Sequence, residues 1–396
     1  MKTILYVHHC SSIGGGSYCM LNILKSLDRD LYNPIVLLSS QGPLVEEIKK
    51  LDIKVHFLAN LDSVPYNRSL FNRGTFSKYW KVNNSIKGYI AKLDEIKPDL
   101  VYLNSMMLYP YLKPSHELGI KTIIHIREHW PLNEHIYQLH RAQMHIRKYS
   151  SHVLAINDFA AHQVPGIKDK VSIVYDWINL KSRYKELPLA SFFNEDVTNK
   201  RIILFTGGSA QNKGAKEVAQ IFSEELTDPN LRLLMLGNSI RDFGPSWKNK
   251  IKIALSKLHI LEFYTYELNE IVKRDSRIVC APNIYEIKHL LDQCYCQVSF
   301  FTIPHANLAM AECIVNNTVC LGARTEESEE YSMNGRLAFL YEMNNKKSFI
   351  NTFHQLENEY SNMKQNLIKD SHIISKKFRQ ADNVKIINEI YKKLLS

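Results

Sequence analysis

The sequence lacks long apolar runs. No stretch approaches the roughly 20 apolar residues that a helix needs to span a bilayer, so we predict no transmembrane segment. Near the amino terminus, the apolar run from Ile4 to Val7 is interrupted at once by His8 and His9. Such a run is too short for the apolar region of a secretory leader, and we therefore expect a chain without one.

Cysteine pairs with metal-ligand spacing are also missing. The seven cysteines are odd in number, and Cys294 and Cys296 stand too close together for a zinc knuckle. We expect reduced thiols in a cytoplasmic protein. The Asp-x-Asp segment from Asp28 to Asp30 ends the first expected helix, far along the chain from the strand ends that would bind a ligand. We interpret it as a turn, and the sequence offers no convincing metal site.

Acidic residues are fewer than basic ones. The 396 residues include 50 Lys and Arg against 40 Asp and Glu, which gives a net charge of +10. This balance favours an anionic partner such as a nucleotide, a nucleic acid or lipid headgroups. The apolar content of 45% is typical of globular proteins, and the length predicts two domains.

Short strand-like runs alternate with helical patterns along the chain, which is typical of parallel sheets covered on both faces. A first series runs from TILYV (3–7) to VSIVYD (171–176), and a second begins at RIILFTGG (201–208). We predict an α/β fold with two doubly wound, Rossmann-like domains, 1–180 and 181–375, that face each other across a cleft. Ligand sites in this fold class lie at the carboxyl ends of the strands.

One segment, 63–93, contains no acidic residue. Its basic and aromatic side chains include Arg68, Phe71, Arg73, Phe76, Lys78, Tyr79, Trp80, Lys81, Lys87, Tyr89 and Lys92. A solvated surface fits this composition, and so does a surface that docks anionic lipid headgroups or a lipid-linked acceptor. A single-stranded nucleic-acid platform would use the same residue types, but nothing else in the sequence supports a nucleic-acid partner.

Two glycine-rich turns each follow an expected strand. Gly14 to Gly16 precede the first helix, and Gly207 and Gly208 precede a helix that begins near Lys213 and Gly214. A lysine beside the free N–H groups of a helix start suits a diphosphate. The spacing matches neither a Walker loop nor a dinucleotide-binding fingerprint. Read alone, each turn is either a phosphate cradle or only a tight turn.

A third feature follows a strand that ends near Thr302. Asn307 is suited to cap the next helix, and Glu312 interrupts the otherwise apolar face of that helix. A carboxylate in apolar surroundings is unfavourable unless it is paired or binds a polar ligand. Ribose hydroxyls suit it, because a carboxylate can accept hydrogen bonds from both of them.

In their order and spacing, these segments resemble the family-4 glycosyltransferases, which have the GT-B fold. GGGSYCMLNILKSL (14–27) resembles the family's GGAE-type loop and first helix, and GGSAQNKG (207–214) resembles its G-R-x4-K-G loop. PHANLAMAECIVNNTVCLGA (304–323) resembles its E-x7-E segment. The similarity also includes KPDLVYLNS (97–105) and SIVYDWINL (172–180), and it covers nearly the whole chain.

The resemblance implies a retaining transferase that uses a nucleotide-diphosphate sugar as donor and needs no metal or other cofactor. In such enzymes the residue that matches Glu312 binds the donor ribose, and the residue that matches Lys213 contacts the donor phosphates. The donor-binding positions that it implies are Gly14, Gly15, Gly16, Gly207, Gly208, Lys213, His305, Ala306, Asn307, Leu308 and Glu312.

Two positions depart from the family's pattern. Gly208 stands where the family has Arg, and Pro304 stands where it has the first Glu, which reads hydroxyls of the donor sugar. His305 either substitutes as a phosphate or sugar contact or only packs in the turn. Two alternatives stay open. One is a nucleotide-sugar epimerase of the GT-B fold, and the other, which the two departures motivate, is a non-catalytic subunit of a polysaccharide-assembly complex.

The resemblance assigns acceptor binding to the amino-terminal domain. IIHIREHW (123–130) ends an expected strand with Arg127, Glu128 and His129, where the family often carries a His near the reacting hydroxyl. We predict these three as catalytic residues. Glu128 would orient a neighbour or bind an acceptor hydroxyl.

The resulting prediction is a glycosyltransferase for surface polysaccharide, that is, capsule, O-antigen or exopolysaccharide. Its acceptor would be a saccharide, in the simplest case lipid-linked. The enzyme would be cytoplasmic and would attach to the inner face of the cell membrane through 63–93. The tail, 376–396, has apolar residues at helical spacing, and the resemblance implies that this helix returns to the amino-terminal domain.

Overall fold

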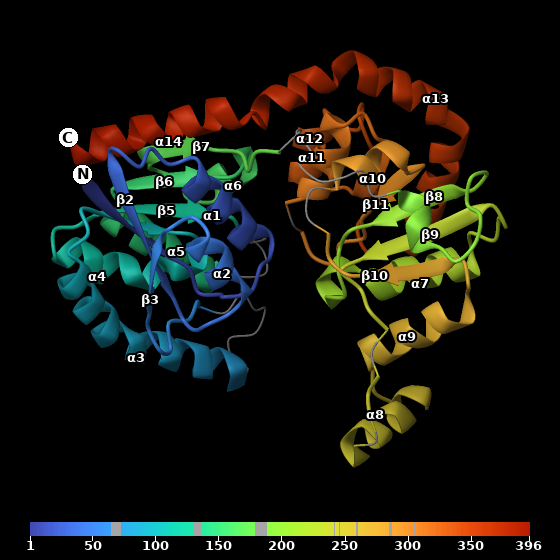
Figure 1. Ribbon diagram of the computed structural model, residues 1–396, viewed down its shortest axis with the longest axis horizontal. Coiled ribbons are helices and arrows are strands. Elements are labelled where there is room, and N and C mark those ends of the chain that lie inside the picture. Colours follow the sequence, from blue (N-terminus) through green and yellow to red (C-terminus); the bar gives the residue numbers. More distant parts are fainter. Residues whose placement is uncertain are drawn as a thin grey trace. The chain divides into compact units, whose positions relative to one another are not determined.

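The computed structural model describes the chain apart from a few short segments and single residues. Those outside the description are 65–72, 130–135, 179–187, 241, 245, 259, 285–286 and 305, and for 73–75 and 136 only the backbone is described. The chain divides into two compact units (Figure 1). Unit 1 contains Met1–Trp177 and Lys377–Ser396, and unit 2 contains Ile178–Lys376.

Unit 1 is built on a seven-stranded parallel sheet in the order β3-β2-β1-β4-β5-β6-β7. The strands are β1 (Lys2–Val7), β2 (Tyr32–Leu38), β3 (Lys54–Phe57), β4 (Leu100–Leu103), β5 (Lys121–Ile126), β6 (His152–Ala155) and β7 (Val171–Ile173). The helices are α1 (Gly15–Lys25), α2 (Pro43–Lys49), α3 (Arg73–Ile96), α4 (Leu112–Glu117), α5 (Ile136–Tyr149) and α6 (Asp158–His162), with the 3-10 turns η1 (Met106–Tyr111) and η2 (Lys168–Lys170). Parallel neighbours need such crossover connections.

The core of unit 1 explains why its strands read as unbroken apolar runs. All residues from Ile4 to Val7 in β1 are fully buried, as a strand covered on both faces requires. The last helix, α14 (Gln380–Leu395), packs on the same core, and Ile387 and Ile390 lie in it. The hydroxyls of Tyr6 and Tyr391 are 2.8 Å apart, and both side chains are buried. The end of the chain is therefore part of unit 1.

Unit 2 has a six-stranded parallel sheet in the order β10-β9-β8-β11-β12-β13. The strands are β8 (Arg201–Phe205), β9 (Leu231–Leu236), β10 (Ile278–Ala281), β11 (Cys296–Val298), β12 (Cys320–Ala323) and β13 (Phe339–Tyr341). The helices are α7 (Ala215–Glu224), α8 (Trp247–Lys257), α9 (Tyr264–Arg274), α10 (Lys288–Gln293), α11 (Leu308–Val315), α12 (Glu326–Ser332) and α13 (Lys346–Lys377), with the 3-10 turns η3 (Leu189–Phe192) and η4 (Gln211–Lys213).

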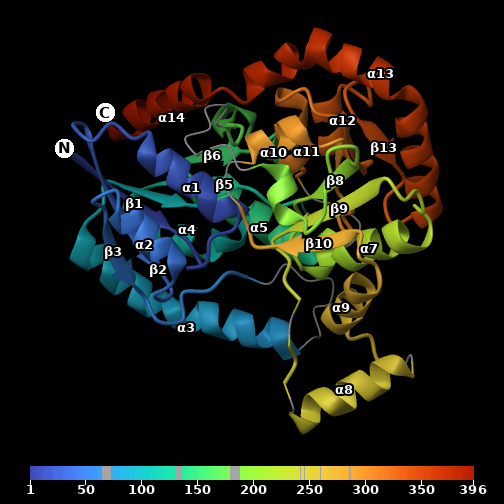
Figure 2. The ribbon, with the colours of Figure 1, turned by 45° about the vertical axis from the view of Figure 1, so that its right-hand side comes forward.

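Both sheets are wound outward from a central strand. Figure 2 shows part of this arrangement within each unit, with β8, β9 and β10 labelled in unit 2. The strand order reverses between β1 and β4 in unit 1 and between β8 and β11 in unit 2. The carboxyl ends of the strands at such a reversal form the crevice in which doubly wound sheets bind ligands. The predicted α/β class with two doubly wound domains is confirmed. The edge strand β13 was not predicted, although it lies in the apolar run from Leu337 to Tyr341.

Across the described helices, none has both the length and the apolar character that crossing a bilayer requires.

Candidate functional site

Two loops of unit 2 meet at the strand-order reversal between β8 and β11. The first follows β8 and contains η4, which ends at Lys213, and the second follows β11 and leads to α11. The backbone N–H of Thr302 donates to the Asn212 carbonyl oxygen at 3.2 Å, and the Thr302 hydroxyl lies 3.4 Å from the Gln211 carbonyl oxygen. These contacts hold the two loops together at the position where this fold class binds ligands.

Glycine is required by the backbone in the first loop. Gly208 has φ +68° and Gly214 has φ +70°, in the left-handed region that side chains with a Cβ rarely adopt. A Cβ at Gly214 would also overlap the Phe300 carbonyl oxygen. The departure at Gly208 thus has a structural reason, because the Arg of the family's pattern would be strained in this conformation.

Lys213 is half-buried between these loops. Its ammonium group lies 4.7 Å from the centroid of the Phe301 ring. This ammonium group makes no ion pair or hydrogen bond with any residue that the structure describes. Burial disfavours the charged form and lowers the pKa of Lys213 from 10.5 to about 7. A nearby anion would reverse that shift.

Glu312 lies on α11 between the fully buried Ala311 and Cys313. Its side chain is half-buried, and within the described part of the chain no donor or cation reaches its carboxylate. Burial raises the pKa of Glu312 from 4.5 to about 7. The first two turns of α11 therefore hold an acid that is poised to accept hydrogen bonds from a ligand.

Asn307 fixes the start of α11. Its side-chain oxygen accepts from the backbone N–H of Met310 at 3.1 Å, and its amide donates to the Ser299 hydroxyl at 2.9 Å. Asn307 is fully buried, as a capping residue held in this way would be. The helix begins at Leu308, directly after its predicted cap, and it extends past Glu312 to Val315. Asn307 thereby positions the backbone of the loop, and His305 lies outside the described residues.

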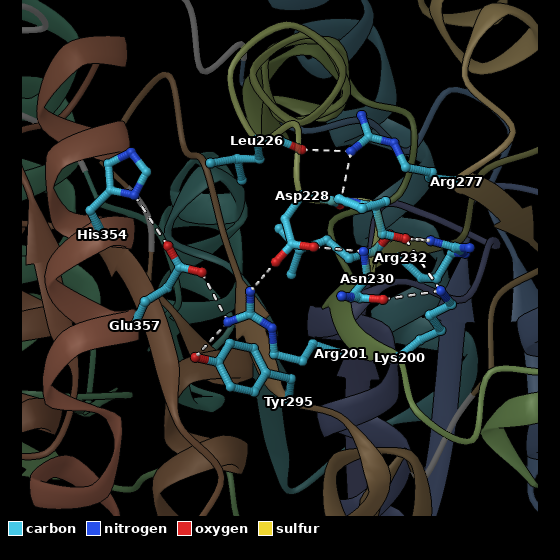
Figure 3. Close-up of polar contacts among 12 residues, drawn as sticks. Lys200, Arg201, Leu226, Asp228, Asn230, Arg232, Arg277, Tyr295, His354 and Glu357 are labelled. Carbon is cyan, nitrogen blue, oxygen red and sulfur yellow. Dashed lines mark hydrogen bonds and ion pairs between the residues drawn. The ribbon is translucent and has the colours of Figure 1, made fainter.

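Charged groups at the opposite end of the same sheet are paired (Figure 3). Arg201, the first residue of β8, has guanidinium nitrogens 2.7 Å from the Asp228 carboxylate and 2.9 Å from the Glu357 carboxylate. Arg277 donates to the Leu226 carbonyl oxygen at 2.7 Å (Figure 3). At this end of the sheet, the charged side chains of Arg201 and Arg277 therefore have partners within unit 2.

The glycine turn of unit 1 leads directly into α1. Gly14 is the N-cap residue, and no side chain caps the helix. A Cβ placed on Gly14 or Gly15 would meet no heavy atom within 4 Å, whereas one on Gly16 would lie 3.7 Å from Arg127 Cδ. Unit 1 leaves space for a side chain at Gly14 and at Gly15. The packing of unit 1 therefore does not explain why these two positions are glycine.

Arg127 is buried and fully engaged. Its guanidinium lies 2.5 Å from one Asp176 carboxylate oxygen, and its Nε donates to Asn104 at 2.9 Å. It also donates to His125 Nδ1 at 3.2 Å. The Asn104 amide in turn donates to the Gly16 carbonyl oxygen at 3.0 Å, which ties this arginine to the glycine turn.

Sequence reasoning missed two members of this cluster, Asn104 and Asp176. Both stood in quoted segments, at the ends of KPDLVYLNS and of VSIVYD. A polar residue at or shortly after the end of an expected strand is a signal that could have found them, because the carboxyl ends of parallel strands share one edge of a sheet. Their partnership with Arg127 depends on strand order, which the sequence does not display.

Glu128 and His129 are held by contacts within unit 1. The Glu128 carboxylate accepts from the Ser105 hydroxyl, from the backbone N–H of Met106 at 2.9 Å and from that of Arg127 at 3.1 Å. Burial nevertheless raises the pKa of Glu128. His129 is buried and stacks on Phe159, with ring centroids 3.8 Å apart. The structure thus gives Glu128 a positioning contact to the loop after β4.

The described part of 63–93 only partly fits a docking surface. Phe76 and Trp80 on α3 are 62% and 67% exposed. Tyr89, by contrast, is fully buried, and its hydroxyl lies 2.8 Å from the Ser115 hydroxyl. The interpretation of Tyr89 as a surface aromatic was therefore wrong, because its side of α3 packs into unit 1. Arg68 and Phe71 lie outside the described residues.

The Asp-x-Asp segment and the cysteines are the residues that could in principle bind a metal ion. Asp28 accepts from the backbone N–H of Asp30 at 3.0 Å, as in a turn. Over the described residues, no group of three or more His, Cys, Asp or Glu side chains is arranged to hold a metal ion. All seven cysteines are free thiols.

Comparison with known proteins finds similarity in structure only. No family profile and no curated protein sequence matches the chain. HepE from Anabaena, solved in complex with UDP and glucose, matches with a TM-score of 0.74 and 16% identity over 98% of this chain and 99% of that one. A glycosyltransferase from Rickettsia africae matches with a TM-score of 0.65 and 17% identity over 100% and 99% of the two chains.

An epimerase shares the fold as well. A UDP-N-acetylglucosamine 2-epimerase matches with a TM-score of 0.58 and 14% identity over 99% of this chain and 96% of that one. The chain therefore has the GT-B fold of two Rossmann-like domains.

Proposed function

We propose that this protein is a glycosyltransferase that takes its sugar from a nucleotide-diphosphate sugar. The observation that carries the proposal is the pair Lys213 and Glu312, whose charged groups have no ion-pair or hydrogen-bond partner among the described side chains. Lys213 ends the 3-10 turn after β8, and Glu312 lies on α11, which follows the neighbouring strand β11. An ammonium group suits the diphosphate, and a carboxylate suits the two ribose hydroxyls. The solved complex of the similar HepE with UDP-glucose supports the same ligand class.

The proposed chemistry is a transfer with retention of anomeric configuration. The bond from the sugar to the diphosphate breaks, the β-phosphate oxygen accepts the proton of the incoming hydroxyl, and that hydroxyl forms the new glycosidic bond. Lys213, the turn at Gly207 and Gly208, and the backbone of Ala306 and Leu308 would neutralise the departing diphosphate. In this proposal no metal ion takes part.

In the proposed acceptor site, Arg127 and Glu128 are positioning residues and His129 lies near the reacting hydroxyl. Arg127 forms an ion pair with Asp176, and Glu128 accepts a hydrogen bond from the backbone of Met106. These contacts support positioning roles for Arg127 and Glu128. The acceptor would be a lipid-linked saccharide of surface-polysaccharide synthesis. Phe76 and Trp80 of α3, both exposed, support attachment of unit 1 to an anionic membrane, together with Lys78.

Ligand-induced thermal shifts test the donor proposal. UDP, GDP and their sugars would be added to the wild type and to the variants Lys213→Ala and Glu312→Ala. We expect at least one nucleotide sugar to raise the melting temperature of the wild type and to raise it much less in both variants. A protein that responds to no nucleotide and no nucleotide sugar would lead us to withdraw the proposal.

Gly15→Val tests the glycine turn separately. Because a Cβ there meets nothing within 4 Å, the variant should fold like the wild type. If the turn borders the donor diphosphate, as we propose, the added side chain should abolish transfer. Normal transfer by Gly15→Val would show that the turn only connects β1 to α1.

A nucleotide-sugar epimerase is the second candidate, and the similarity to a UDP-N-acetylglucosamine 2-epimerase favours it specifically. The two reactions differ in their need for an acceptor. The protein would be incubated with each nucleotide sugar alone. An epimerase would convert the nucleotide sugar to its epimer, whereas a glycosyltransferase would show no turnover until a saccharide acceptor is added.

A further inference from the structure

Helix α8 presents an apolar stripe to solvent. In both ribbon views it lies beyond α9, on the side away from the strands of unit 2 (Figures 1 and 2). Trp247, Ile251 and Leu258 are 67%, 49% and 67% exposed. At about 100° per residue, these three and the exposed Ala254 lie within about 60° of one another around the helix. A helix of a globular protein normally turns such a stripe toward the core.

The opposite face of α8 attaches it to unit 2. Ser256 is buried, and its hydroxyl donates to the Glu267 carboxylate on α9 at 2.8 Å. The Asn249 amide donates to the Phe243 carbonyl oxygen, and the half-buried Ile253 lies on the same side of the helix. The contacts of this face therefore fix the outward direction of the apolar stripe.

The charged side chains of α8 itself all have one sign. The segment FGPSWKNKIKIALSKLHIL, residues 243–261, contains four lysines and no acidic residue. Lys248 and Lys252 flank the stripe on one side, and Lys250 and Lys257 flank it on the other. All four side chains are exposed. An apolar stripe with a cationic rim complements a surface that is apolar inside and anionic outside.

We propose that α8 is an interfacial helix that lies on an anionic lipid bilayer. Trp247, Ile251 and Leu258 would enter the boundary between headgroups and acyl chains, and the lysines would extend to the phosphates. The cationic rim on both sides favours lipid over a protein partner, and Trp is enriched at membrane interfaces. This surface belongs to unit 2, it is distinct from α3, and it does not depend on the proposed transferase function.

Vesicle flotation without donor or acceptor tests the proposal. We expect the full chain to float with vesicles of equal parts phosphatidylglycerol and phosphatidylcholine, and not with phosphatidylcholine alone. Replacement of both Trp247 and Ile251 by Ser should weaken partitioning by about tenfold or more. Each Lys→Gln change at Lys248 or Lys250 should weaken it about fivefold.

The matched control is Ile368→Ser, which removes an isoleucine that is 71% exposed on α13. It should float like the wild type, and all variants should keep the wild-type melting temperature because the replaced side chains face solvent. The proposal is overturned if the wild type does not float, or if the α8 variants float normally while Trp80→Ser on α3 does not. It is also overturned if light scattering shows a wild-type dimer that the α8 variants convert to monomer with vesicle binding intact.

Discussion

Charged side chains near the two ends of strand β8 differ in whether they are paired. Where the strand begins, Arg201 is paired with Asp228 and Glu357. Beyond its carboxyl end, the Lys213 ammonium group lies over the Phe301 ring without an ion pair, and the Glu312 carboxylate on α11 has no partner, as far as the described residues show. Burial without a partner disfavours the charged form of each group in the free protein. Perturbed groups of this kind gather at functional sites, and these two lie where the fold class binds its ligands.

Unit 1 offers a third case at the carboxyl edge of its own sheet. Arg127 is 7% exposed and is paired with Asp176, so its charge is matched within the unit. It is a fixed part of the framework around the glycine turn, whereas Lys213 is available to an anion. The comparison of paired with unpaired groups leads to four predictions, which follow from the largest expected effect to the smallest.

Asp176→Ala should give the largest loss of stability. It would leave the Arg127 guanidinium buried without its counter-charge, which costs about 3–5 kcal/mol of unfolding free energy. Denaturant unfolding measures this loss. Asp176→Asn, which keeps a hydrogen-bond acceptor, should lose less. A loss below roughly 1 kcal/mol, the level of an exposed pair, would show that Arg127 is not held as we describe.

Lys213→Ala should reduce transfer by about 10² to 10³, the effect of removing one group that stabilises the departing charge. Its unfolding free energy should stay the same or rise, because the lost ammonium group was desolvated and had no ion-pair partner among described residues. Lys216→Ala is the matched control three positions along the chain, since Lys216 is paired with Glu267 at 2.8 Å. That variant should keep its transfer rate and lose stability, and the reverse pattern would contradict the comparison.

Glu312→Gln should reveal the raised pKa through stability. The pKa of Glu312 rises from 4.5 to about 7, so the folded wild type is disfavoured progressively as pH increases through that window. The variant lacks this pH-dependent destabilisation, because the Gln side chain does not ionise. The gain of the variant over the wild type should therefore be absent below pH 4.5 and reach about 1–3 kcal/mol above pH 7. Thermal unfolding across this pH range measures it, and a difference independent of pH would argue against burial as the cause.

Arg201→Ala should have the smallest effect. Its side chain is 33% exposed, so the loss of its ion pairs should cost about 1 kcal/mol or less. Nucleotide affinity and transfer should not change, because the residue lies at the opposite end of β8. A defect in nucleotide binding as large as that of Lys213→Ala would remove the distinction between the two ends.

The sequence predicts most of the fold, for physical reasons that particular residues illustrate. The apolar run from Ile4 to Val7 reads as a buried parallel strand, and it is one. Lys213 and Glu312 were recognisable because each places a charge where the local pattern calls for apolar or turn residues. Their lack of a partner among the described residues could only come from the structure.

Other features were beyond the sequence because they depend on tertiary pairing. The interpretation of Tyr89 failed because composition does not say which side of a helix packs inward. The partnership of Arg127 with Asn104 and Asp176 joins residues far apart in the chain through the strand order of unit 1. The apolar stripe of α8 is visible as a periodic pattern, but only the structure shows that it faces away from unit 2.

Calorimetric titration of the protein with UDP and with GDP tests most directly the claim that Lys213 and Glu312 form a nucleotide-diphosphate site. We predict that the wild type binds at least one of the two, that Lys216→Ala binds it equally well, and that Lys213→Ala binds it at least about tenfold more weakly, as the loss of one charge-assisted contact implies. Equal affinity of Lys213→Ala and the wild type, or no binding of either nucleotide by the wild type, would contradict that claim.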